Sequence, residues 1–268
     1  MDYLAGLDYP VQALVATIFT WAVTALGAAV VFAFKNINKS FMDAMLGFAG
    51  GVMLAASFFS LLSPAETMAE NLGLVPWLTL SIGFFGGGLL LFAGDKVYGV
   101  IEAKKSKAAS AGNSGIKRCL MLIISITLHN IPEGLAVGVA FGSLAYGLDG
   151  ATPTAAYLLA LGIGLQNFPE GTAVSVPLRR EGMSCPKAFF FGQLSAVVEP
   201  IAGFLGALLV LKVRVLLPYL LAFAAGAMIY VVVEELIPES QSNPKKDVMA
   251  IFALTGFAVM MVMDIALG

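Results

Sequence analysis

The sequence predicts an all-α integral membrane protein, in which one domain over residues 1–268 forms eight transmembrane helices. The first observation is composition: 59% of the residues are hydrophobic and 12% are charged, whereas soluble domains carry about 25% charged residues. The second is a series of apolar stretches that reach the roughly 20 residues an α-helix needs to cross the hydrocarbon core. The third is the segregation of the basic residues between the two ends of these stretches.

Eight apolar stretches have the required length. Their approximate limits are 10–34, 41–62, 74–97, 118–146, 154–178, 185–211, 215–237 and 247–267. Most connections between them are short. Residues 98–117 are the exception, because their lysines and their Ser, Gly and Ala cluster predict a flexible cytoplasmic loop.

Basic residues give the orientation. With eight spans, only Lys212 and Arg214 fall on one side of the membrane. The other 13 of the 15 basic residues fall on the opposite side, which the positive-inside rule assigns to the cytoplasm. We therefore expect a multi-pass protein of the cell (inner) membrane with both termini on the extracytoplasmic side. No basic run predicts a nucleic-acid partner.

A short motif occurs twice at membrane depth. His129–Val139 reads HNIPEGLAVGV, and Gln166–Val176, 37 residues later, reads QNFPEGTAVSV, with seven of eleven positions identical. A carboxylate inside a membrane span costs roughly 3 kcal/mol on insertion scales, so such residues usually serve a function. The repeat predicts the two halves of a metal site on a transport path.

Helical spacing brings the polar side chains of each motif to one face. The first copy supplies His129, Asn130 and Glu133, and the second supplies Gln166, Asn167 and Glu170. All six offer an oxygen or nitrogen lone pair, and zinc accepts imidazole nitrogen and carboxylate oxygen. Packing and interhelical hydrogen bonding are the alternative roles for His129 and the three amides.

Each motif also contains a proline, Pro132 or Pro169, which has no N–H to donate within its helix. We expect spans 4 and 5 to kink there and to expose a carbonyl to the site. The two spans run in opposite directions, as in transporters built from inverted repeats.

Further polar residues are weaker candidates. Glu199, beside a proline in span 6, is a candidate metal ligand, and Gln193 lies in the same span. The other candidates for the transport path, each with a structural or interfacial alternative, are Met53, Ser57, Ser60, Glu234, Glu235, Asp43 and Asp264.

Glycines recur at four-residue spacing in spans 2, 3 and 4, as Gly47 with Gly51, Gly83 with Gly87, and Gly134 with Gly138 and Gly142. Such residues let membrane helices approach closely. A surface along which helices slide is the functional alternative.

The HNxPEG stretch, its QNxPEG partner and the Glu-Pro pair of span 6 resemble the ZIP (ZRT/IRT-like) metal transporters, above all the GufA-type bacterial branch. The resemblance covers essentially the whole chain. It implies eight transmembrane helices, uptake of divalent metal into the cytoplasm, and zinc as the usual substrate, with cadmium, iron, manganese or cobalt carried by some members.

The family's metal site also carries over residue by residue. The resemblance implies a first metal on His129, Glu133, Gln166 and Glu170. It implies a second on Asn130, Glu133, Asn167, Glu170 and Glu199. It further implies a homodimer in which spans 1, 4, 5 and 6 move against spans 2, 3, 7 and 8 in an elevator motion. Many members have His where this chain has Gln166, which predicts weaker binding of borderline-soft metals.

Three other functions compete with metal transport. An enzyme such as an intramembrane zinc protease would need a HExxH-like motif, which the sequence lacks, so we expect no enzymatic activity. In a proton-coupled transporter of a non-metal solute, the carboxylates would relay protons. A metal-selective channel is the third alternative.

Overall fold

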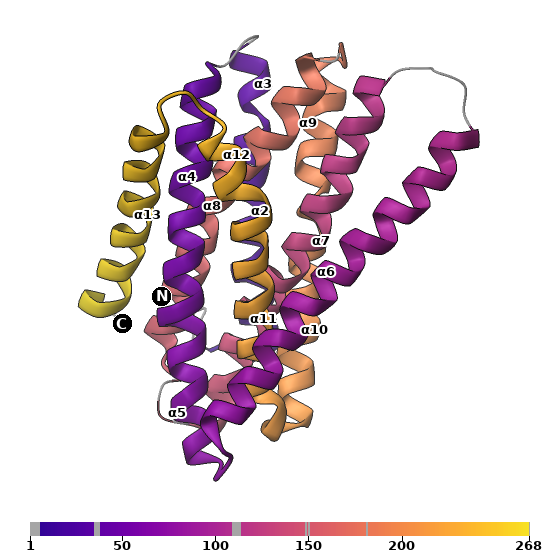
Figure 1. The fold of residues 1–268 in the computed structure, drawn as a ribbon. Coiled ribbons are helices and arrows are strands. Elements are labelled where there is room, and N and C mark those ends of the chain that lie inside the picture. The colour runs from indigo at the N-terminus through magenta and orange to yellow at the C-terminus, as the bar shows by residue number, and fades with distance from the viewer. Residues whose placement is uncertain are drawn as a thin grey trace.

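The computed structural model describes residues 6–34, 38–108, 114–147, 149, 151–180 and 182–267. Within these ranges it leaves out the side chains at 95, 98–108, 114–122, 125, 129, 180 and 267. All regular structure in the described residues is helical. The long helices run side by side along one direction, and α6 crosses the others at an incline (Figure 1).

The first half of the chain contains three helical stretches. In order, their elements are α2 (Tyr9–Ala28) and α3 (Val30–Ala33), then α4 (Lys39–Ala55), the π-helix η1 (Ala56–Leu62) and α5 (Ser63–Asn71), then α6 (Pro76–Ala108). The side-chain oxygen of Asn38 caps the start of α4 by accepting from the Ser40 N–H at 2.8 Å. Asn is among the residues that helix N-caps prefer.

Five further stretches follow. Their elements are α7 (Ser114–Ser143) with η2 (Leu144–Tyr146), α8 (Pro153–Arg180), α9 (Cys185–Leu194) and α10 (Val198–Lys212), η3 (Arg214–Leu216) with α11 (Leu217–Val231), η4 (Val232–Leu236) and α12 (Ile237–Gln241), and α13 (Lys246–Leu267). η4 is a second π-helix. Pro132 and Pro169 lie inside α7 and α8, and a bend at either proline stays a prediction.

Six stretches of the described residues are long and apolar enough to cross a membrane. They are Tyr9–Ala33, Lys39–Asn71, Pro76–Gly94, Cys185–Lys212, Arg214–Gln241 and Lys246–Ala266. The chain is therefore a multi-pass membrane protein. α7 and α8, which carry the repeated motif, are not among the six, so the arrangement with eight spans stays a prediction.

The long connection differs from expectation. The sequence predicts a loop over 98–117, but α6 continues to Ala108 and α7 begins at Ser114. The loop prediction was therefore wrong for 98–108 and 114–117, while 109–113 lie outside the described residues. The reason is helix propensity, because Ile101–Ala108 holds Ala, Lys and Glu and neither Gly nor Pro.

The long helices pack most extensively in four pairs, which we place in two groups. In the first group, α7 packs most extensively on α10, and α2 packs on α8. In the second group, α11 packs on α6, and α13 packs on α4. Smaller contacts of α7 with α11 and of α8 with α4 join the two groups.

The glycine-rich faces lie inside these groups. A Cβ at Gly138 of α7 would overlap the carbonyl oxygen of Gly203 on α10, and a Cβ at Gly87 of α6 would overlap that of Phe223 on α11. Gly51 of α4 approaches Ala253 of α13 in the same way. The glycines thus bring backbones together within each group, and the alternative of a sliding surface stays a prediction.

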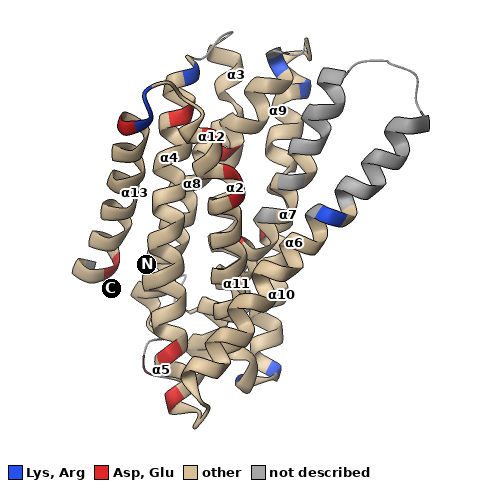
Figure 2. Cartoon of the chain, in the orientation of Figure 1, with Lys and Arg blue, Asp and Glu red and all other residues tan. Residues whose placement is uncertain are grey.

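Charged residues in the described part of the chain gather mainly toward the two ends of the bundle. Figure 2 shows most Lys and Arg at the end where α3 and α9 lie, and acidic residues on α5 at the opposite end. A few red segments, which mark acidic residues, lie between the two ends (Figure 2). This is the pattern that the positive-inside rule expects, and the direction of insertion stays a prediction.

Candidate metal centre

The two copies of the motif meet in the bundle interior. Asn130 and Glu133 lie on α7, and Gln166, Asn167 and Glu170 lie on α8. All five are buried, with Glu170 the most exposed at 5%. The fully buried Glu199 lies in the first turn of α10, directly after the break between α9 and α10.

Hydrogen bonds connect these residues across helices. The Gln166 Nε2 donates to Glu133 Oε1 at 2.7 Å, which joins α8 to α7. The Asn167 Nδ2 donates to both carboxylate oxygens of Glu199, at 2.9 and 3.0 Å, which joins α8 to α10. The Asn130 Nδ2 donates at 2.9 Å to the carbonyl of Ser195, in the break that precedes α10.

Each of the three amides is therefore oriented by its NH₂ group. Its nitrogen faces a protein acceptor, so its oxygen points elsewhere. The oxygens Asn130 Oδ1, Gln166 Oε1 and Asn167 Oδ1 are buried and have no hydrogen-bond partner among the described residues. If any of these amide groups were rotated by half a turn, its oxygen would face another acceptor.

Two carboxylate oxygens share this condition. Glu133 Oε2 and Glu170 Oε2 are buried and have no hydrogen-bond partner in the described part of the chain. Glu133, Glu170 and Glu199 are also close enough to repel one another electrostatically. The ion pair found among the described residues joins Lys39 and Asp43, so no Lys or Arg there neutralises these three glutamates.

Together, these five acceptor oxygens form an unsatisfied site. A buried polar group left without a partner costs about 1–3 kcal/mol, and more when the group is charged. Divalent cations would satisfy such oxygens, because amide carbonyls and carboxylates are oxygen ligands of divalent metals. The arrangement is suited to binding a desolvated divalent cation.

His129 lies on α7, one helical turn before Glu133, but its side chain is outside the part that the structure describes. Among the described side chains, no three His, Cys, Asp or Glu residues form a ready metal cluster. Amide oxygens instead supply three of the five acceptors that have no partner among the described residues.

The candidates on span 2 lie on or beside η1. Met53, Ser57 and Ser60 are all buried, and Ser57 Oγ has no partner among the described residues. The Ser60 Oγ donates to both carboxylate oxygens of Asp264 on α13, at 2.8 and 2.9 Å. The sequence named both residues of this pair separately, but 204 positions separate them, so only the fold reveals that they pair.

The two acidic residues of η4 differ from each other. Glu235 lies close enough to Glu170 for their charges to interact, whereas Glu234 is exposed. Gln193 is half-buried, and its amide donates to the Phe190 carbonyl of its own helix at 3.1 Å. Glu235 is thus brought to the site, while Gln193 and Glu234 make no hydrogen bond to the network in the described part of the chain.

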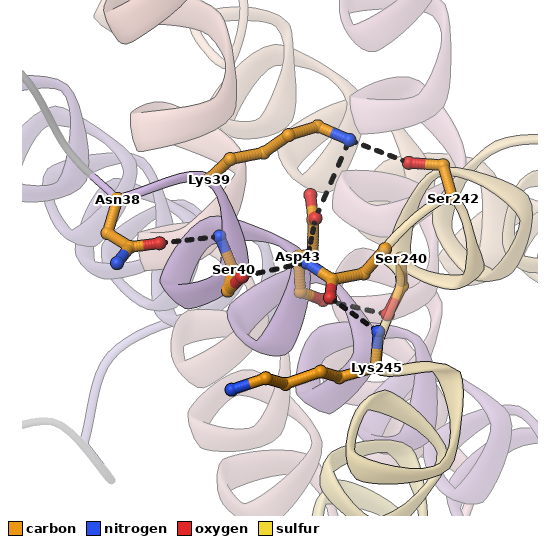
Figure 3. Close-up of polar contacts among 8 residues, drawn as sticks. Asn38, Lys39, Ser40, Asp43, Ser240, Ser242 and Lys245 are labelled. Atoms are coloured by element: carbon orange, nitrogen blue, oxygen red, sulfur yellow. Dashed lines mark hydrogen bonds and ion pairs between the residues drawn. The ribbon is translucent and has the colours of Figure 1, made fainter.

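Asp43 belongs to a separate polar cluster at the start of α4. Its carboxylate accepts from Asn243 Nδ2 at 2.7 Å and lies 3.7 Å from the Lys39 ammonium, and its carbonyl accepts from Ser240 Oγ at 2.7 Å (Figure 3). Lys39 also donates to Ser242 Oγ at 2.9 Å. These contacts hold α4 against α12 and the connection to α13, which favours the structural alternative for Asp43.

Sequence reasoning missed Thr20 of α2, whose hydroxyl donates to Glu199 Oε2. Thr17, Thr20 and Thr24 are all buried. Their spacing of three and four residues puts them on one helix face. A polar stripe along an otherwise apolar span was the signal that could have revealed this contact.

The chain is similar to known proteins of one family. Residues 102–264 match the family model described as ZIP Zinc transporter. The zinc transporter ZIP11 of Xenopus tropicalis is 38% identical, covering 98% of this chain and 99% of its own length. Zinc transporter GufA of Myxococcus xanthus is 33% identical (95% and 98%), and zinc transporter ZIPB of Bordetella bronchiseptica is 35% identical (92% and 79%). The chain belongs to the ZIP zinc transporter family and is a divalent-metal transporter.

Proposed function

We propose that this protein moves Zn²⁺ across the cell membrane into the cytoplasm through the site between α7, α8 and α10. The observation that carries the proposal is the set of five buried acceptor oxygens on Asn130, Glu133, Gln166, Asn167 and Glu170, none of which has a hydrogen-bond partner among the described residues. Their clustering with carboxylates that no described Lys or Arg neutralises is explained by a divalent cation as the transported substrate.

The donor set also bears on which metals are carried. With His129 added, the first position would hold Zn²⁺ by one imidazole, two carboxylates and the Gln166 oxygen, a set that Cd²⁺, Fe²⁺, Mn²⁺ or Co²⁺ could also use. A second metal would lie beside it, with Glu133 and Glu170 bridging and Asn130, Asn167 and Glu199 completing its shell.

We propose alternating access of the elevator type. The first helix group (α2, α7, α8, α9 and α10) would carry the metal past the second group (α4, α6, α11 and α13). The extensive contacts of α7 with α10 and α2 with α8 in the first group, and of α6 with α11 and α4 with α13 in the second, support this division. We further propose a homodimer in the inner membrane with both termini outside.

Uptake into proteoliposomes tests the proposal. Wild type should take up Zn²⁺ and Cd²⁺ saturably, and Glu133→Ala and Glu170→Ala should abolish this uptake. Glu70→Ala is the matched control, because Glu70 is an exposed acidic residue at the end of α5. Each variant is checked by gel filtration and thermal unfolding.

The outcome also separates the competing functions. Uptake of metal that rises without saturation would favour a channel. No metal flux from folded wild type, or flux that is indifferent to both substitutions, would refute the site and favour a non-metal solute.

A further inference from the structure

Glu199 differs from the other two glutamates of the network because donors occupy both of its oxygens. The Thr20 hydroxyl on α2 donates to Oε2, and Asn167 Nδ2 on α8 donates to Oε1 and Oε2. Glu133 and Glu170 each keep an unpartnered oxygen in the described part of the chain. In this structure Glu199 is therefore held by the protein, and the other two glutamates are ready for a cation.

Both donors have a second acceptor within reach. The Thr20 Oγ lies 3.0 Å from the carbonyl of Thr17, and Asn167 Nδ2 lies 3.3 Å from the carbonyl of Thr20. A buried donor that loses its acceptor is costly, but here each donor can turn to a backbone carbonyl. Glu199 can therefore move away from these two donors, and each donor still has an acceptor for its hydrogen bond.

The hydrogen bonds compete with metal for the same oxygens. A carboxylate has about four lone-pair sites, and three hydrogen bonds reach Glu199. A metal that engages both oxygens of Glu199 must therefore displace Thr20 or Asn167.

We propose that Thr20 is a positioning residue that holds Glu199 away from the metal in the metal-free protein. When the metal binds, Thr20 releases Glu199 and donates to the Thr17 carbonyl instead. The proposal rests on the proposed metal site. It means that part of the binding free energy is used to release Glu199, which limits affinity and favours release of the metal. Thr20 itself does not ligate the metal.

The test compares Thr20→Val with Thr20→Ser. Valine keeps the shape and removes the donor, whereas serine keeps the hydroxyl. The Zn²⁺ Kd is measured on purified protein in detergent by competition with a chromophoric chelator. We expect Thr20→Val to bind Zn²⁺ about tenfold more tightly, the order of factor that losing one charge-assisted hydrogen bond implies. In proteoliposomes its KM and its maximal rate should both fall, and Thr20→Ser should match wild type.

An unchanged or weaker Zn²⁺ affinity in folded Thr20→Val would overturn the proposal, because a merely structural threonine predicts that result. If Thr20→Val does not fold, Thr20→Cys replaces it, since a thiol is a weak donor and should give an intermediate tightening. Glu133→Gln reports separately on the site itself. Zn²⁺ binding as tight as wild type in that variant would refute the proposed function, whatever Thr20 does.

Discussion

Replacing Glu133 by Gln should stabilise the metal-free protein while it weakens metal binding. Gln keeps the size of the side chain, and its oxygen can still accept from Gln166 Nε2, as Glu133 Oε1 does at 2.7 Å. Its new NH₂ group takes the place of Oε2, which has no partner in the described part of the chain. It also removes a charge that Glu170 and Glu199 repel.

The magnitude follows from these contacts. An unpartnered buried acceptor costs about 1–3 kcal/mol, and the substitution removes this acceptor together with its charge. For a chain of this size, that corresponds to a rise in Tm of roughly 2–4 °C per kcal/mol. With Zn²⁺ at about 100 times its Kd, wild type should gain about 2.7 kcal/mol, and a variant with about 100-fold weaker affinity should gain only about 0.4 kcal/mol.

The assay is thermal unfolding in detergent with a chelator and then with Zn²⁺. We expect the curves to cross: Glu133→Gln is the more stable protein without metal, and wild type is the more stable with it. The matched control is Glu70→Gln, which changes an exposed carboxylate and should follow wild type in both conditions. Equal zinc stabilisation of Glu133→Gln and wild type, or a metal-free variant less stable than wild type, would refute the reasoning.

Three further predictions concern packing, the α4 cluster and selectivity. Gly138→Val should sharply reduce the yield of folded protein in gel filtration, because a Cβ there meets the Gly203 carbonyl; a normal yield would contradict the close contact of α7 with α10. Asn243→Ala should lower the thermal stability by about 1–3 kcal/mol, because it leaves the buried Asp43 carboxylate without its amide donor. The Zn²⁺ Kd of this variant should stay at the wild-type value. A large change in Kd would favour the alternative that Asp43 belongs to the transport path. Gln166→His should raise the ratio of Zn²⁺ to Mn²⁺ affinity about tenfold in competition binding, since zinc accepts imidazole nitrogen and manganese prefers oxygen; an unchanged ratio would remove Gln166 from the metal shell.

Rules that use only neighbouring residues along the chain were sufficient to predict the helical class and the positions of the helices. Apolar length identifies a membrane helix, and the ranges expected around 154–178 and 185–211 match α8 at Pro153–Arg180 and the α9–α10 stretch at Cys185–Lys212. The same rules failed at 98–108, because a polar but helix-prone segment can prolong a helix beyond its apolar part. The π-helices η1 and η4 leave no pattern that the sequence analysis could have used.

The candidate ligands were also readable from the sequence, because a repeated carboxylate and amide motif in apolar surroundings is costly and rarely accidental. The sequence did not predict which groups each of these side chains contacts. Only the fold shows that Asn130, Gln166 and Asn167 turn their nitrogens to protein acceptors, while their oxygens have no partner in the part of the chain that the structure describes. Amide orientation depends on the neighbours, and those neighbours come from other helices.

The sequence by itself thus determined the membrane class, the family resemblance and the choice of candidate ligands, because these depend on composition and on spacing along one helix. The tertiary structure decided the pairing of Ser60 with Asp264, the cluster around Asp43 and the hydrogen bond from Thr20 to Glu199. These contacts join residues about 180 to 204 positions apart. Helical periodicity relates residues three or four positions apart, so such contacts depend on how separate helices pack.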